Sequence, residues 1–250
     1  MQIDLDFTGY VAICTGGASG MGLMTAQKMA ASGAKVVLCD VNGEAAEAKA
    51  AEILAAGGEA LGLRVDVRHY DEIQAAVDRT IEAFGRIDYL INAAGGASTR
   101  IRHCTGPFWE RDPEIIEWGL DVNLKGTLLF TRAVFSHMMA VRHGCVITFG
   151  SVSGEEGTDC IDYAASKSGM HGLTKSIARA GAPYGVRCCC VMPGPVLTRP
   201  GMANMKTALG RAAEPYELVD FILYLCSDSH GSFITGSSHL IDGGRLLATY

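Results

Sequence analysis

A tyrosine and a lysine four residues apart are the pair in this sequence best suited to moving a proton. Tyr163 and Lys167 lie in a helical stretch, and residues four apart share one face of a helix. A cation beside a phenol favours the phenolate, so we expect a lowered pKa for Tyr163, as a general acid/base requires. Ser151 ends the preceding apolar run and could orient a substrate oxygen. The Tyr-x3-Lys spacing also occurs on ordinary exposed helices, so its weight depends on the rest of the sequence.

A glycine-rich segment near the amino terminus is suited to binding a phosphate. Residues 15–22 read TGGASGMG and lie between an apolar run and a helical pattern. Glycine permits a positive φ and lets a phosphate approach the backbone, where the helix start and its dipole favour an anion. A tight turn with no ligand is the alternative, but the strand before it and the helix after it favour a dinucleotide. The expected cofactor-binding residues here are Gly16, Ser19, Gly20, Met21 and Gly22.

Asp40 bears on which dinucleotide would bind. It ends the second apolar run, where a carboxylate can accept hydrogen bonds from the adenosine ribose hydroxyls and repel a 2′-phosphate. No Arg or Lys lies within the glycine-rich turn or directly after Asp40 to attract that phosphate. The sequence therefore favours NAD(H) over NADP(H). Asp40 could instead cap the next helix, but Asn42 is better placed for that role.

The elements that must position these residues alternate between short apolar runs and helical stretches. Nearly continuous apolar runs are typical of parallel strands covered by helices on both faces. We therefore predict one α/β domain over residues 1–250, a doubly wound Rossmann-type sheet of about seven parallel strands flanked by helices. The long helix is expected at 113–139, and two loops without strong periodicity, at about 95–112 and 198–211, are expected at the carboxyl ends of strands, where ligands bind.

Composition excludes several classes of protein. The chain has 48% hydrophobic residues and a net charge of -6, without a Lys/Arg run, so neither a nucleic-acid nor an anionic-membrane partner is expected. The segment Met1–Asp6 lacks the features of a secretory signal, and no apolar run is long enough to cross a bilayer. The nine cysteines form no CxxC pair, so we interpret them as core residues in a reducing compartment, with no metal site. A cytoplasmic location is the expectation.

Six motifs in one order resemble the short-chain dehydrogenase/reductase family, in its single-domain branch, over essentially the whole chain. They are Gly16-x3-Gly20-x-Gly22, Asp40, Asn92-Ala93-Ala94-Gly95, Asn123, Ser151 and Tyr163-x3-Lys167. The resemblance implies an NAD(H)-dependent oxidoreductase that interconverts a secondary alcohol and a ketone, with Tyr163 as general acid/base. Its implied catalytic residues are Asn123, Ser151, Tyr163 and Lys167. A nicotinamide-binding sensor or scaffold with the same fold and no turnover is the alternative.

The resemblance also assigns cofactor contacts beyond the glycine-rich turn. It implies that Lys167, with Tyr163 beside it, holds the nicotinamide ribose and that Asn123 positions a water that relays protons through Lys167. The family positions for adenine, for the cofactor ribose and for the nicotinamide carboxamide correspond here to Asp66 and Val67, to Asn92, Ala93 and Gly95, and to Pro193, Val196 and Thr198. The family commonly forms tetramers through its long helix and its tyrosine helix, so a homotetramer, or a homodimer, is expected.

Two points stay open at this stage. The spacing from Ser151 to Tyr163 is one residue shorter than is usual in the family, so Ser153 is a rival for the serine role. The substrate is a small alcohol or ketone of open class: a hydroxy acid, a sugar or polyol, or a steroid or other cyclic alcohol. The residues that bear on that choice are Arg100, Arg102, His103, Phe108 and Trp109 in one loop, Arg199 in the other, and Glu155, Glu156 and Asp159 before Tyr163.

Overall fold

One sheet of seven parallel strands forms the centre of the protein, as predicted. The computed structural model describes residues 5–104 and 106–247, so Thr105 of the loop at 95–112 and the first residues of Met1–Asp6 lie outside it. The strand order is β3-β2-β1-β4-β5-β6-β7, so the winding reverses between β1 and β4, the place where such sheets bind ligands. The strands are β1 (Val11–Thr15), β2 (Lys35–Asp40), β3 (Glu59–Arg64), β4 (Tyr89–Asn92), β5 (Gly144–Phe149), β6 (Val186–Pro193) and β7 (Ser238–Ile241).

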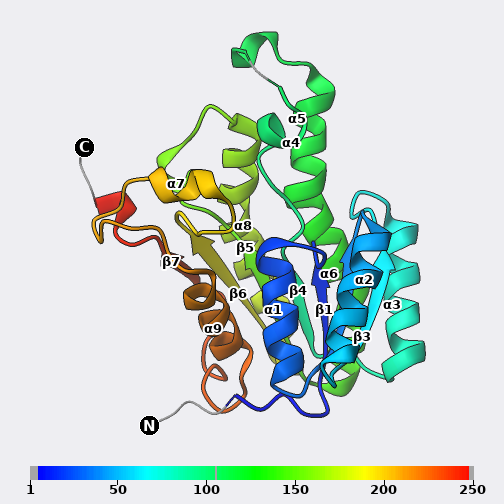
Figure 1. The fold of residues 1–250 in the computed structure, drawn as a ribbon. Coiled ribbons are helices and arrows are strands. Elements are labelled where there is room, and N and C mark those ends of the chain that lie inside the picture. The colour runs from blue at the N-terminus through cyan, green and yellow to red at the C-terminus, as the bar shows by residue number, and fades with distance from the viewer. Residues whose placement is uncertain (1–4, 105, 248–250) are drawn as a thin grey trace.

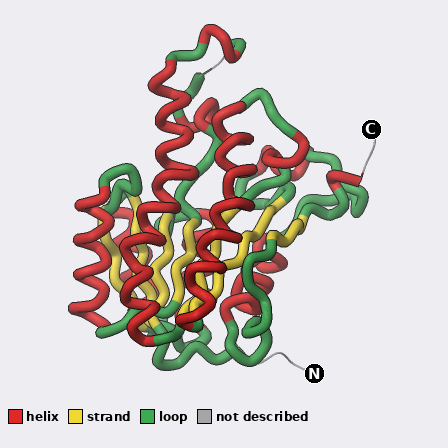
Figure 2. The backbone as a smooth tube through the Cα atoms, turned by 180° about the vertical axis from the view of Figure 1, so that it is seen from behind, coloured by secondary structure: helices red, strands yellow, loops and turns green. Residues whose placement is uncertain are grey.

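Helices cover both faces of this sheet (Figure 1). Side chains of α1, α2 and α9 share one core, and those of α3, α6 and α8 share the core on the opposite face, which Figure 2 shows from behind. Alternate residues of β1 enter the two cores: Ala12 and Cys14 one, Ile13 the other, all without exposed surface. The helices are α1 (Gly20–Ala31), α2 (Gly43–Ala55), α3 (Tyr70–Phe84), α4 (Ser98–Ile101), α5 (Pro113–Leu120), α6 (Gly126–Val141), α7 (Ser153–Glu156), α8 (Ile161–Gly181) and α9 (Pro215–Cys226).

The long helix differs from the single element expected at 113–139. A π-helical turn at Asp121–Lys125 joins α5 to α6, and Figure 1 shows α5 extending well beyond the sheet. Asp112 is the N-cap of α5, and its side chain accepts a hydrogen bond from the Glu114 N–H at 2.9 Å. π turns are rare and occur frequently at functional sites, and this one contains Asn123.

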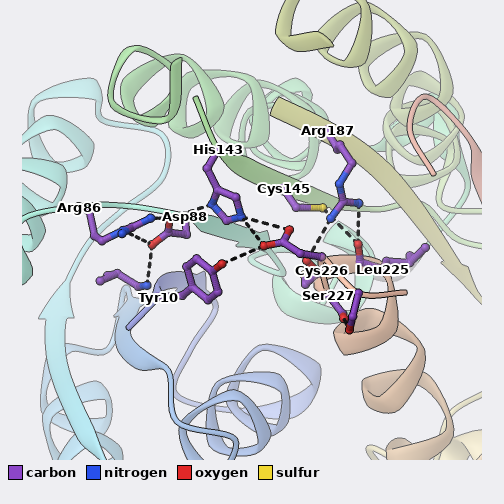
Figure 3. A network of polar contacts seen from close by, with 12 residues as sticks. Tyr10, Arg86, Asp88, His143, Cys145, Arg187, Leu225, Cys226 and Ser227 are labelled. Atoms are coloured by element: carbon purple, nitrogen blue, oxygen red, sulfur yellow. Dashed lines mark hydrogen bonds and ion pairs between the residues drawn. The ribbon is translucent and has the colours of Figure 1, made fainter. Parts of the chain in front are cut away.

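A polar network lies at the opposite, amino-terminal edge of the sheet (Figure 3). Asp88 has no exposed surface and accepts hydrogen bonds from the Val11 N–H at 2.9 Å and from Arg86 at 2.6 and 2.8 Å. Its carboxylate also contacts the His143 ring at 2.9 Å, and the far side of that ring contacts Asp228 at 3.0 Å. The network therefore ties the starts of β1, β4 and β5 to the segment after α9.

The cysteines behave as expected of core residues. All nine are free thiols, and all except Cys104 are buried. Within residues 5–104 and 106–247, no helix is both long and apolar enough to cross a bilayer. The same part of the chain contains no group of three or more His, Cys, Asp or Glu side chains suited to a metal ion.

Candidate active site

The turn between β1 and α1 has the shape of a dinucleotide cradle. Gly16 has a φ of 61°, a left-handed conformation that favours glycine. A Cβ on Gly22 would lie 2.4 Å from the Gly16 carbonyl oxygen, so only glycine allows the start of the helix to approach the turn this closely. Ser19 precedes α1, and its hydroxyl makes no capping hydrogen bond. The turn thus leaves its backbone and the helix start open to an anion, as a pyrophosphate requires.

A cavity of about 950 Å³ runs from this turn across the carboxyl ends of the central strands. It brings together almost all of the residues singled out from the sequence. Those that line it are Gly16, Ser19, Gly20, Met21, Gly22, Asp40, Asp66, Val67, Ala93, Gly95, Ser151, Tyr163, Lys167, Pro193, Val196 and Thr198. Asn92 and Asn123 do not line it, because both side chains are buried behind its wall.

Tyr163 and Lys167 lie together near the N-terminus of α8, which begins at Ile161. The Lys167 Nζ lies 5.4 Å from the centroid of the tyrosine ring and donates a 2.8 Å hydrogen bond to the carbonyl of Phe149, at the end of β5. Lys167 is buried, and this burial lowers its pKa to about 8. The lysine is therefore held in place by the end of a strand and remains mostly protonated at neutral pH.

The expectation of a lowered pKa for Tyr163 is wrong. Burial raises the pKa of the phenol above its usual value, although the hydrogen bond with Ser151 and the charges of Arg199 and Arg100 act in the opposite direction. Loss of hydration penalises the phenolate more than the neighbouring donors and cations stabilise it. The side chain is therefore a neutral phenol at neutral pH, which suits it to donate a proton.

The geometry also separates the two candidate serines. Ser151 acts to lower the pKa of the Tyr163 phenol, and its Oγ accepts a 3.1 Å hydrogen bond from the Ser153 N–H. Ser153 lines the same cavity but begins α7, and it supports Ser151 through its backbone. Ser151 is therefore the serine that acts on Tyr163, and its catalytic role stays a prediction.

Asn123 fixes the wall of the cavity in this structure. Its amide donates to the carbonyls of Gly96 at 3.0 Å and Gly119 at 2.8 Å, and its Oδ1 accepts from the Gly96 N–H at 2.9 Å. A Cβ on Gly95 would lie 2.4 Å from that oxygen and 3.8 Å from the Lys167 Nζ. The asparagine is therefore separated from Lys167 only by the bare backbone of Gly95.

The end of the cavity near β2 and β3 is lined by the carboxylates of Asp40 and Asp66 and by the guanidinium of Arg68. Asp40 accepts hydrogen bonds from the Ala18 N–H at 3.1 Å and the Asn42 N–H at 3.0 Å, and so fastens the glycine-rich turn to the end of β2. Asn42 is the cap of α2, as expected. Asp66 is held by Arg68, whose Nη2 lies 2.6 Å from its Oδ2. Arg68 lines the cavity, although the sequence near Asp40 had suggested no cation.

The two loops at the cavity mouth are only partly as expected. The longer one contains α4 and a 3-10 turn at Phe108–Glu110. Phe108 and Trp109, considered as pocket residues, do not line the cavity, and Trp109 is 81% exposed. Trp118 from α5 lines it instead, together with Arg100 and Arg199. Arg100 and Arg199 were among the loop residues considered from the sequence, whereas nothing in the sequence indicated Trp118, because only the tertiary structure decides where a side chain of a protruding helix points.

Comparison with known proteins places this geometry in a family. A family model described as short chain dehydrogenase matches residues 10–208. The chain belongs to the short-chain dehydrogenase family. This family consists of oxidoreductases that act on hydroxyl groups and use nicotinamide cofactors, and the glycine cradle and the tyrosine–lysine pair of this short-chain dehydrogenase fit that chemistry.

Curated relatives of this short-chain dehydrogenase match along nearly their whole length. The 3-alpha-(or 20-beta)-hydroxysteroid dehydrogenase of Mycobacterium tuberculosis is 38% identical over 247 residues, covering 95% of this chain and 90% of the relative. The (2S)-[(R)-hydroxy(phenyl)methyl]succinyl-CoA dehydrogenase subunit of Thauera aromatica is 34% identical, with coverage of 95% and 96%. The 3-oxoacyl-[acyl-carrier-protein] reductase of Synechocystis is also 34% identical, with coverage of 96% and 98%. The names of these relatives refer to a hydroxysteroid, a substituted succinyl-CoA and a 3-oxoacyl group on acyl carrier protein.

Proposed function

We propose that this protein is an NAD(H)-dependent oxidoreductase that interconverts a secondary alcohol and a ketone, with Tyr163 as the general acid/base. The observation that carries the proposal is the convergence of Tyr163, Ser151 and Lys167 on one wall of a cavity whose other end is a glycine cradle. A proton-transfer group and a dinucleotide site in one cavity are what hydride exchange with a carbonyl requires.

The bound nicotinamide would supply the hydride acceptor or donor. In ketone reduction, the neutral phenol of Tyr163 donates its proton to the oxygen as negative charge develops there. The hydroxyl of Ser151 donates a second hydrogen bond to the same oxygen and orients it. In alcohol oxidation Tyr163 must first lose its proton, and the positive charges around it assist that loss. Burial opposes the loss of this proton, so we expect alcohol oxidation to require a higher pH than ketone reduction.

We assign Lys167 to the cofactor ribose and to proton exchange with Tyr163. Its ammonium, protonated at neutral pH, stands on the tyrosine ring and can donate to a ribose hydroxyl. Asn123 acts through the wall that it shares with Gly95 and Gly96, and a water held beside it would connect Lys167 to solvent. The remaining cofactor contacts are proposed for the residues at family positions. Asp66, Val67, Ala93, Gly95, Pro193, Val196 and Thr198 line the cavity, and Asn92 lies buried behind its wall.

We propose NAD(H) as the preferred cofactor because Asp40 stands at the end of β2 on the cavity wall. A carboxylate there accepts from ribose hydroxyls and repels a 2′-phosphate. Arg68 is the cation that could favour NADP(H), but its guanidinium is engaged by Asp66 in three hydrogen bonds. A phosphate would have to compete with that carboxylate for Arg68.

We also propose that the protein is a homotetramer (or homodimer) in the cytoplasm. Phe130, Val134 and Met138 of α6 enter the core, whereas Leu128 on the same helix is 48% exposed. Apolar surface left on α6 is available to a second copy. Nine free thiols are consistent with a reducing compartment. Light scattering at micromolar protein concentration tests the assembly, and a monomer there would contradict it.

The decisive experiment follows the absorbance of the reduced nicotinamide with a panel of keto acids, keto sugars and cyclic ketones, each with NADH and with NADPH. We expect turnover with NADH on one class and its loss in Tyr163→Phe, with the Kd for NADH unchanged. Turnover only with NADPH would overturn the cofactor preference alone. Binding of NADH without turnover on any ketone would instead favour a sensor or scaffold.

A further inference from the structure

Two arginines from different loops line the cavity that contains Tyr163. Arg100 lies on α4, and Arg199 lies in the loop after β6. Both line the cavity, and the positive charge of each acts on the hydroxyl of Tyr163. The two guanidiniums also act on each other, since burial and the charge of Arg199 both lower the pKa of Arg100. The reacting end of the cavity is therefore strongly positive, in a protein whose net charge is -6.

Neither guanidinium has a carboxylate partner within the described part of the chain. The other cavity arginine, Arg68, is paired with Asp66, whereas no ion pair involves Arg100 or Arg199. The nearest side-chain partner of Arg199 is the sulfur of Met202, at 3.8 Å. Two like charges held close together without a counter-ion repel each other, so an anion between them would be stabilised.

Arg100 is directed into the cavity by a rigid support. The loop before α4 is fixed by the two hydrogen bonds between Gly96 and Asn123. The buried Ser98 hydroxyl lies 3.3 Å from the Cys160 sulfur, which ties α4 to the segment before Tyr163. A Cβ on Gly96 would lie 2.8 Å from the Arg100 Nη2, so the absence of a side chain there lets the guanidinium fold back. The placement of Arg100 is therefore built into the wall of the site.

The carboxylates nearby do not neutralise this pair. Glu155 and Glu156 precede Tyr163 in the sequence, but both already have partners. Glu155 lies 2.6 Å from His171, and Glu156 lies 2.9 Å from Arg245. Asp159 also lines the cavity, but its single negative charge can compensate only one of the two guanidiniums. The local excess of positive charge remains.

We propose that the substrate is an anion, a hydroxy acid or keto acid whose carboxylate is held by Arg100 and Arg199 while its reacting carbon faces Tyr163. The inference rests on the proposed function, since it names the substrate class of that same site. A planar guanidinium binds a carboxylate with two parallel hydrogen bonds, so two of them define both the position and the direction of the acid. A neutral sugar or steroid would leave both charges uncompensated.

Matched pairs of substrates test this directly. Each 2-, 3- and 4-keto acid is compared with its methyl ester, in the wild type and in Arg100→Gln and Arg199→Gln. We expect kcat/KM for the best acid to exceed that of its ester by at least about 10-fold, and each substitution to lower the acid value about 10- to 100-fold, chiefly through KM. The ester should change less than about 3-fold. Arg102→Gln is the control, because Arg102 is exposed on the same segment but does not line the cavity.

Two results would overturn the proposal while leaving the oxidoreductase in place. One is equal turnover of ester and acid, with both arginine variants behaving as the wild type. The other is a raised Kd for NADH in Arg199→Gln with an unchanged acid-to-ester ratio, which would assign that guanidinium to the cofactor phosphates.

A binding assay decides the matter even if no ketone turns over, the case in which the proposed function itself fails. Trp118 lines the cavity, and Trp109→Phe leaves it as the only tryptophan in the chain. Its fluorescence is titrated with succinate and with succinamide in the presence of NAD. Saturable binding of succinate alone, lost in the Arg100→Gln/Arg199→Gln double variant, supports the anion site. Equal responses to both probes, or none to either, would refute it.

Discussion

Asp88→Ala is the substitution for which the structure predicts the largest loss of stability. Asp88 is fully buried and joins the starts of three strands (Figure 3). Its removal leaves the Val11 N–H without its 2.9 Å acceptor, and it leaves Arg86 and His143 without the carboxylate between them. The change therefore leaves a buried backbone N–H without an acceptor, and it leaves two partly exposed cationic side chains without the buried carboxylate that they share.

The size of the effect follows from those lost partners. Breaking a buried ion pair by deleting one member costs about 3–5 kcal/mol of unfolding free energy. For a chain of this length each kcal/mol lowers Tm by about 2–4 °C, which gives a loss of roughly 6–20 °C. Asp220→Ala is the matched control. Asp220 pairs with Lys28 at 3.5 Å, with both side chains about half exposed, and such pairs contribute about 1 kcal/mol or less.

The pH dependence of this loss provides a sharper test. Burial alone would lower the pKa of His143, but its contacts with Asp88 and Asp228 outweigh burial and raise it. A raised pKa stabilises the fold below the usual histidine value, and that contribution is lost as pH rises through the folded-state pKa. Burial alone would raise the pKa of Asp88, but its donors lower it, so its contribution is lost only in acid. The difference between wild type and variant should thus be larger at about pH 5.5 than at about pH 9.

Thermal and urea denaturation at these two pH values measure the effect. A Tm for Asp88→Ala within about 2 °C of the wild type at both pH values would refute the reasoning. So would a difference that grows toward alkaline pH. The first result would mean that the three strand starts are held by apolar packing alone, and the second that the ionic contact with His143 is not what Asp88 contributes.

Three further predictions concern the active site. Because the pKa of Tyr163 is raised, kcat/KM for alcohol oxidation should increase with pH throughout the alkaline range up to about 10, whereas ketone reduction should be nearly constant around neutrality; a profile with an oxidation optimum near neutral pH would contradict this. Ser151→Ala should lower kcat by about 100-fold or more, and Ser153→Ala by less than about 5-fold, as measured by steady-state kinetics; the reverse order would reassign the serine role. Gly22→Ala should weaken NADH binding by at least about 10-fold, because its Cβ meets a backbone oxygen at 2.4 Å, whereas Gly172→Ala, with open space around it, should leave the Kd measured by titration unchanged.

Local patterns in the sequence predicted most of the scaffold. Runs such as those of β1 and β5 are nearly continuously apolar and are buried at every position because both faces of the sheet are covered, and the apolar pattern is visible without a structure. Asn42 marked the start of α2 through its capping chemistry. The order of the glycine-rich turn, Ser151 and the tyrosine–lysine pair placed each at the carboxyl end of a strand or on the adjoining helix. One cavity follows from that order, because all parallel strands end at the same edge.

The behaviour of those groups and their surroundings depend on the folded arrangement. The order of residues reveals which chemistry is present, a phenol beside an ammonium and a serine at a strand end. Whether the phenol gains or loses acidity depends on how much water reaches it, and packing, not spacing, sets that balance for Tyr163. Likewise Arg68, Arg100 and Trp118 enter the cavity because their backbones turn toward it. Local propensity determines the elements, but the direction of a loop side chain depends on contacts between residues far apart in the chain.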